Sequence, residues 1–285
     1  FLVVSLLTTG IVILIIRSSR EPPPITLEMA LAVLDQGAYP EARYLAEKLA
    51  LRSDLPEADL GGPVFILGAV TAYEARELPE KERKSQYLVA AAYLEEARVR
   101  GFPTGRRAEG LFLLAESLFH SGQWVAARPV LKEALPANPQ RKTLLHDMLV
   151  QACAEAVPPL LKEALQYNTA YLADRWLPQI RKHQGILRQA DLQFRLGDLE
   201  GCRKTLAGLP ADPALKAGRK WIEGQMVLAE ARAARTKGDA AAAQQKYQEA
   251  IQLFRQAQTD ESIGLWAMRR AQYHIGLCLE EMGDL

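Results

Sequence analysis

The chain has 285 residues, of which 49% are hydrophobic and 24% are charged, the proportions of an ordinary globular protein. These proportions exclude a disordered or collagen-like chain, and the length suffices for two domains or for one array of repeats. The 35 basic and 34 acidic residues leave a formal net charge of +1, so we expect no nucleic-acid partner.

The first segment, residues 1–16, is apolar and uncharged, with one serine and two threonines as its only polar residues. We predict that it is an uncleaved transmembrane helix that begins before residue 1, because no small-x-small cleavage site follows it. It would make the chain a single-pass membrane protein that contacts the lipid bilayer. Arg17 and Arg20 follow this segment, but they leave open on which side of the membrane the rest of the chain lies.

Residues 17–25 contain three consecutive prolines and are predicted to form an extended linker. From residue 26 onward, Ala, Leu, Gln, Glu, Lys and Arg dominate, and the alternation of β-branched residues that marks strands is missing. Gly or Pro interrupts the pattern at intervals that suit short helices. The sequence therefore predicts an all-α body over residues 26–285.

The clearest structural unit covers residues 111–139, which are predicted to form a helix, a glycine turn, a second helix and a proline stop. Gly122 would take the left-handed conformation that ends the first helix, and Trp124 would open the second. Ala127 is small where the two helices are expected to cross, and Pro139 prevents further helix.

This order of small, glycine, aromatic, small and proline positions resembles the tetratricopeptide repeat family. Related patterns follow Gly37, Gly197 and Gly238, and another copy carries a charged insertion over residues 76–84 between its two helices. The small residues expected at the helix crossings of successive repeats are Ala42, Ala90, Ala127, Ala164, Cys202 and Ala243.

The resemblance implies a right-handed α-solenoid of about six to seven helix-turn-helix repeats over residues 26–285. Gly276 and Gly283 are separated by the same interval as Ala115 and Gly122, so Gly283 would end the first helix of one more repeat. We therefore expect the last repeat to be incomplete and the array to continue beyond residue 285.

The sequence contains no motif for nucleotide binding, zinc proteolysis, serine hydrolysis or calcium binding. We therefore expect no catalytic activity, no cofactor, no metal site and no small-molecule substrate. Four histidines lie in different repeats without ligand partners, so we interpret them as solvated: His120, His146, His183 and His274. The three cysteines are interpreted as small buried hydrophobic residues: Cys153, Cys202 and Cys278.

The resemblance also implies a binding groove, because in this family the first helix of each repeat lines the concave face. Apolar and aromatic side chains interleaved with single charges suit a peptide or helix of another protein. As an alternative, Phe112 and Phe194 pack between repeats and bind nothing. The candidate groove residues are Phe112, Glu116, Phe119, Leu187, Asp191, Phe194, Leu228, Arg232, Arg235 and Tyr273.

The leading hypothesis is therefore a membrane-tethered scaffold or adaptor that binds a partner protein or peptide in this groove. Two alternatives remain open. The repeats could be the substrate-docking arm of an enzyme whose catalytic domain follows residue 285. They could also belong to a repeat subunit of an envelope secretion or assembly complex.

Overall fold

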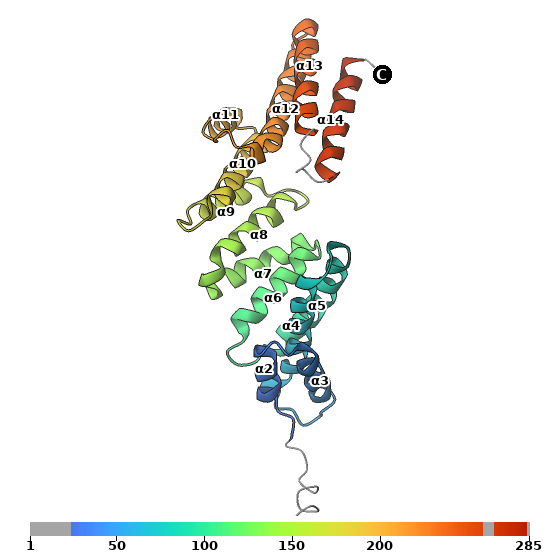
Figure 1. Cartoon of the computed structure of the whole chain (residues 1–285), viewed down its shortest axis with the longest axis vertical. Helices are drawn as coiled ribbons and strands as arrows, with labels where there is room; N and C mark the ends of the chain where they lie inside the picture. The colour runs from blue at the N-terminus through green and yellow to red at the C-terminus, as the bar shows by residue number, and fades with distance from the viewer. Residues whose placement is uncertain (1–23, 259–264, 284–285) are drawn as a thin grey trace, which may run out of the picture. The chain divides into compact units, whose positions relative to one another are not determined.

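The computed structural model describes residues 24–258 and 265–283 (Figure 1). Within these ranges the chain forms helices and no strand, which confirms the all-α prediction and is consistent with a tetratricopeptide-type α-solenoid. The α-helices are α2 (Leu27–Asp35), α3 (Tyr39–Ala50), α4 (Gly62–Glu77), α5 (Glu80–Arg100), α6 (Arg107–His120), α7 (Trp124–Ala137), α8 (Lys142–Ala154), α9 (Leu161–Leu172), α10 (Gln179–Arg195), α11 (Leu199–Ala207), α12 (Pro213–Thr236), α13 (Ala240–Gln258) and α14 (Leu265–Met282).

The chain divides into two compact units, Phe1–Gly122 and Gln123–Leu285, so α2 to α6 belong to unit 1 and α7 to α14 to unit 2. In unit 1, each helix packs against the next, and α4 also contacts α2 and α6. In unit 2, consecutive helices pack from α7 to α11 and from α12 to α14, and α10 contacts α12. We call the even-numbered helices first helices and the odd-numbered ones second helices.

In the described part of the chain, four of the six turns that join a first helix to the following second helix have a glycine at the same place. Gly122, with φ of 82°, ends the segment after α6, and the same left-handed conformation occurs at Gly37, Gly197, Gly238 and Gly283. A side chain on Cβ would strain this conformation, so glycine is the natural residue there. The turn positions predicted from the sequence are confirmed.

The small residues predicted at helix crossings are also confirmed in their register. All six are buried: Ala42, Ala90, Ala127, Ala164, Cys202 and Ala243. Because each lies on a second helix and has little or no side chain beyond Cβ, it allows the neighbouring helix to approach closely.

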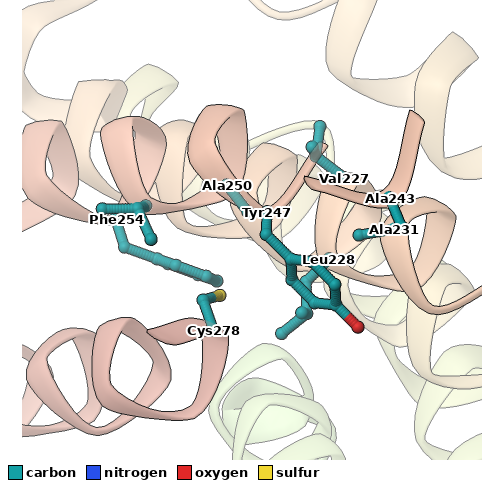
Figure 2. Close-up of a cluster of buried hydrophobic side chains, with 9 residues drawn as sticks. Val227, Leu228, Ala231, Ala243, Tyr247, Ala250, Phe254 and Cys278 are labelled. Atoms are coloured by element: carbon teal, nitrogen blue, oxygen red, sulfur yellow. The ribbon is translucent and has the colours of Figure 1, made fainter. Parts of the chain in front are cut away.

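One core cluster of unit 2 lies among α12, α13 and α14 (Figure 2). Tyr247 and Phe254 of α13 fill its centre, and Cys278 of α14 closes one side. A Cβ atom at Gly224 of α12 would lie 2.8 Å from Phe254 Cε1, so the absence of a side chain at Gly224 makes room for the ring. Small residues on α12 and α13, such as Gly224 and Ala250, therefore set the distance between these two helices.

The charged segment over residues 76–84 does not lie between the two helices, contrary to the prediction of an insertion there. It lengthens both helices, because α4 continues to Glu77 and α5 begins at Glu80, with only Leu78 and Pro79 between them. Proline disfavours helical conformation in the residue before it and is well tolerated at a helix start. Glu80 and Glu82 lie in the first turn of α5, where their negative charges stabilise the helix through its dipole.

The prediction of a single-pass membrane protein is withdrawn. Across the part of the chain that the structure describes, no helix has both the length and the apolar character needed to cross a membrane. The predicted anchor, residues 1–16, lies outside the described residues, as does most of the predicted linker over residues 17–25.

We expect substitution of Ala243 by Leu to lower the free energy of unfolding by about 1–3 kcal/mol, because the added carbons overfill a crossing that has no space. Ala241 lies two residues earlier on the same helix and is exposed, so Ala241→Leu should change it by less than about 0.5 kcal/mol. Urea unfolding of both variants measures the difference. Equal losses would show that the crossing lies elsewhere on α13.

Candidate partner-binding surface

The predicted groove residues of unit 2 lie on α10, α12 and α14, and hydrogen bonds at Glu281 join the last two of these helices. Arg232 of α12 places Nη2 2.6 Å from Glu281 Oε1 and Nε 3.0 Å from Oε2. Arg235 donates to the main-chain carbonyl oxygen of Glu281 at 2.6 Å, and the Tyr247 hydroxyl donates to its carboxylate at 2.8 Å. These donors, Arg232 foremost, hold the pKa of Glu281 below its ordinary value.

An aromatic cluster lies on the same helices. The Trp221 ring of α12 meets the His274 ring of α14 edge to face at 4.8 Å, and the Phe254 ring of α13 lies 5.3 Å from each. The Arg270 guanidinium lies over the Trp221 ring at 5.1 Å. Tyr273 contacts His274 edge to face, and 66% of its surface is exposed. The cluster therefore extends from the core to a solvent-facing ring.

Asp191 of α10 supplies an acidic group to this surface. Burial raises the pKa of its carboxyl group, whereas the nearby charges of Arg195 and Arg270 lower it. The Arg195 Nη1 atom lies 3.8 Å from Asp191 Oδ2. The surface thus combines aromatic rings with a carboxylate and arginines on neighbouring first helices, which is the composition expected for binding a polypeptide.

In unit 1, the corresponding positions on α6 are used within the protein. Phe112 and Glu116 are both buried, and Glu116 Oε2 accepts a hydrogen bond from Arg76 Nη2 of α4 at 2.6 Å. Phe119 is half-buried beside His120. The pair of Arg76 and Glu116 joins two first helices in the same way as Arg232 and Glu281 do in unit 2.

The structure therefore divides the ten predicted groove residues into classes. Phe112 and Leu228 lie in the core and are withdrawn as binding residues. Leu187 and Phe194 pack against a core cluster of α10, α11 and α12, which favours the packing alternative for Phe194. Four more make ion pairs or hydrogen bonds to the protein itself, namely Glu116, Asp191, Arg232 and Arg235. Phe119 is half-buried, and Tyr273 is the one with a largely exposed ring.

Three residues of this surface were missed, although the helical period could have found them. Trp221 lies seven residues before Leu228, and so on the same face of α12. Arg270 and His274 are four residues apart on α14, and Tyr273 lies beside them. The interpretation of the histidines as solvated is wrong for His146, which is buried, and for His274, which packs among aromatic rings.

The cysteine prediction is confirmed, because Cys153, Cys202 and Cys278 are all buried free thiols. Burial raises the pKa of each thiol to about 11, so each stays protonated near neutral pH. Within the described ranges, no group of three or more His, Cys, Asp or Glu side chains is arranged to hold a metal ion.

The stability of the fold should depend on the protonation of His274. Burial lowers the pKa of His274 below its ordinary value, and the pKa values of His120 and His146 shift in the same direction. The unfolded chain therefore takes up protons first as the pH falls through about 6.5, which favours unfolding. Above that pH the contribution of His274 to stability is fully present.

We expect the melting temperature of the wild type to fall more between about pH 7.5 and pH 5.5 than that of a His274→Phe variant, which keeps a ring but cannot titrate. Thermal melting followed by circular dichroism tests this. The carboxyl groups of Glu230 and Glu281, whose pKa values are lowered, act only at more acidic pH. Parallel curves for the two proteins would contradict the prediction.

The ion pair between the first helices of unit 1 should contribute to stability. We expect Arg76→Ala to lower the free energy of unfolding by about 1–3 kcal/mol, because it leaves the buried Glu116 carboxylate without this donor. The control is Arg203→Ala, whose side chain is 55% exposed in its pair with Glu230 and should cost less than about 1 kcal/mol. Chemical denaturation measures both, and equal costs would contradict a special role for the buried pair.

A family model described as tetratricopeptide repeat matches residues 78–142 and residues 211–265. The first match covers α5, α6 and α7, and the second covers α12 and α13, which carry most of the core cluster of Figure 2. No curated protein shows a significant match to the sequence. The two matched segments, together with the helix pairs and their glycine turns, support a tetratricopeptide repeat family for this chain.

Proposed function

We propose that this chain is a protein–protein interaction scaffold that binds a peptide or helix of a partner protein on the surface formed by α10, α12 and α14. Tetratricopeptide repeats generally mediate protein–protein interaction, and the second matched segment includes α12. The role that we propose is binding without catalysis.

The observation that carries the proposal is the exposed Tyr273 ring, which continues a packed cluster of Trp221, His274 and Phe254. Interface hot spots are enriched in Tyr, Trp and Arg that stand on well-packed support. Tyr273 meets this description, because its neighbour His274 is held between the rings of Trp221 and Phe254. A partner side chain could therefore bury the ring of Tyr273 at little cost in conformational entropy.

The charges of the surface favour a partner segment with both apolar and acidic residues. Glu281 already balances Arg232, and Arg235 is bound to a main-chain carbonyl group. Asp191 lies close to both Arg195 and Arg270, so these opposite charges compensate each other in part. The surface as a whole carries more arginine than carboxylate, so an acidic residue of the partner is favoured over a basic one.

The test begins with cross-linking and mass spectrometry of complexes captured by the chain, followed by affinity measurements with each purified partner. We expect Tyr273→Ala to weaken binding about 10-fold or more without lowering the melting temperature appreciably. The matched control is Tyr44→Ala, because Tyr44 is an exposed tyrosine of α3 in unit 1.

Loss of binding in both variants, or in Tyr44→Ala alone, would overturn the assignment of the surface. Unchanged binding in Tyr273→Ala would show that the partner binds elsewhere on the chain. Cross-links that lead from the partner to residues of α12 and α14 would support the proposal independently of any substitution.

A further inference from the structure

We propose that a second docking surface lies where α9 turns into α10, and that it binds an acidic segment of a partner protein that carries an apolar side chain. The surface consists of residues 173–178 between the two helices, the first turn of α8 and the first turn of α10. All of these lie in unit 2, where α8 packs on α9 and α9 packs on α10 (Figure 1). It is separate from the surface around Tyr273.

The centre of this second surface is Trp176, of which 78% is exposed. An exposed tryptophan is unusual in a folded domain, because burial of its large ring is worth more than that of most side chains. The Arg175 guanidinium lies over the ring at 4.9 Å. Arg175 thus covers part of the ring, and most of the Trp176 surface remains exposed to a partner.

The turn that carries Trp176 is fixed by Asp174. The Trp176 main-chain N–H donates to Asp174 Oδ1 at 2.9 Å, and the Thr143 hydroxyl of α8 donates to the other carboxylate oxygen. The main-chain N–H of Leu177 also donates to the Asp174 carbonyl oxygen at 3.2 Å. Because the turn is already ordered, binding at Trp176 would cost little conformational entropy.

Two exposed aliphatic residues extend the apolar part of this surface. Leu144 follows Thr143 in α8 and is 47% exposed, and Ile180 lies in the first turn of α10 and is 42% exposed. The hydroxyl of Thr143 binds the turn, so the first turn of α8 lies next to it. The hydrogen bond between Thr143 and Asp174 holds the turn to α8, and α10 follows the turn directly in the chain, so the three apolar side chains lie on adjoining elements.

The charged side chains of the segments that form this surface are mostly basic. Beside these segments, Asp147 pairs with Arg188, and Asp212 lies 3.8 Å from His183. Across residues 139–145 and 173–184 the acidic side chain is Asp174, whose carboxylate is engaged by Thr143 and by the main chain of Trp176. Those two donors lower the pKa of Asp174. The exposed basic residues of the same segments are Arg141, Lys142, Arg175, Arg181 and Lys182. In a chain of net charge +1, this local excess selects for an acidic partner.

A protein partner fits this surface better than nucleic acid or lipid does. Single-stranded nucleic acid is bound by several aromatic rings in succession, whereas Trp176 is one ring already stacked on one face by Arg175. Membrane-surface segments are amphipathic helices that present a long apolar face, whereas this patch lies on a turn and two helix ends. Trp and Arg are, with Tyr, the residue types most enriched at protein interface hot spots.

The experiment uses the purified chain and a fluorescent synthetic peptide rich in glutamate and leucine. Binding is followed by fluorescence anisotropy at low salt, and the control peptides replace leucine by alanine or glutamate by lysine. We expect the acidic, leucine-containing peptide to bind best. We expect Trp176→Ala to weaken it about 10-fold or more, since the ring supplies the apolar contact.

The charge contribution is tested with the double variant Arg175→Glu/Arg181→Glu, which should also weaken binding about 10-fold or more. The matched control is Lys237→Glu/Arg255→Glu, which changes the net charge equally at exposed residues of the same unit. The surface around Tyr273 favours the same peptide chemistry, so the peptide is also measured with Tyr273→Ala and with Tyr273→Ala/Trp176→Ala. Binding that remains in the first of these variants should be weakened about 10-fold or more in the second, which separates this proposal from the proposed function. Circular dichroism melting confirms that each variant is folded, and Trp176→Phe replaces Trp176→Ala if the latter is not.

Several results would overturn the proposal. Equal losses in the two double variants would mean attraction by net charge alone, and equal binding of the alanine peptide would mean that Trp176 anchors nothing. Absence of binding, or preference for the lysine peptide, would reject an acidic partner. Binding to phosphatidylserine vesicles in place of the peptide, with the same sensitivity to Trp176→Ala, would identify a lipid surface.

Discussion

The fold depends on how closely a second helix can approach its neighbours. Ala42, Ala90 and Ala164 have no measurable exposed surface, and their positions on α3, α5 and α9 correspond to one another. A small side chain at that point lets the larger residues on either side interdigitate, as Tyr247 and Phe254 do around Ala250 on α13. The glycine turns support this arrangement, because they bring the second helix back at the angle that the crossing requires.

Polar contacts add a second level of order, because they join first helices that are not consecutive in the chain. Arg76 reaches from α4 to α6, Arg188 reaches from α10 to Asp147 of α8, and Arg232 reaches from α12 to α14. Each contact joins the first helix of one helix pair to the first helix of the next pair. Such local coupling is typical of repeat proteins, whose stability is approximately the sum of nearest-neighbour terms.

The sequence was sufficient to predict the elements whose cause is local. Glycine at Gly122 and small residues at the crossings leave a strong signature, because few other residues satisfy those positions. The candidate binding surface is harder to predict, since a first helix packs on several sides. In α6, every residue from Gly110 to Leu118 is buried, so no apolar stripe distinguishes a groove face from a core face. The position of Phe112 relative to the turn glycine, read with the family resemblance, predicts a groove residue, and such a count does not register this burial. Trp221 escapes the same count because its partners His274 and Arg270 come from another helix.

The hydrogen bonds to Glu281 at the end of α14 also affect the orientation of Tyr273 in the middle of that helix. The backbone hydrogen bonds between successive turns make an α-helix resist twisting. A contact that fixes the rotation of the helix about its axis at one residue therefore fixes that rotation along the helix. Glu281 lies eight residues after Tyr273 and is held by Arg232, Arg235 and Tyr247 from two other helices. The direction in which the Tyr273 side chain points is thus set by hydrogen bonds more than two helical turns away. If α14 rotated about its axis, the tyrosine ring would point in a different direction.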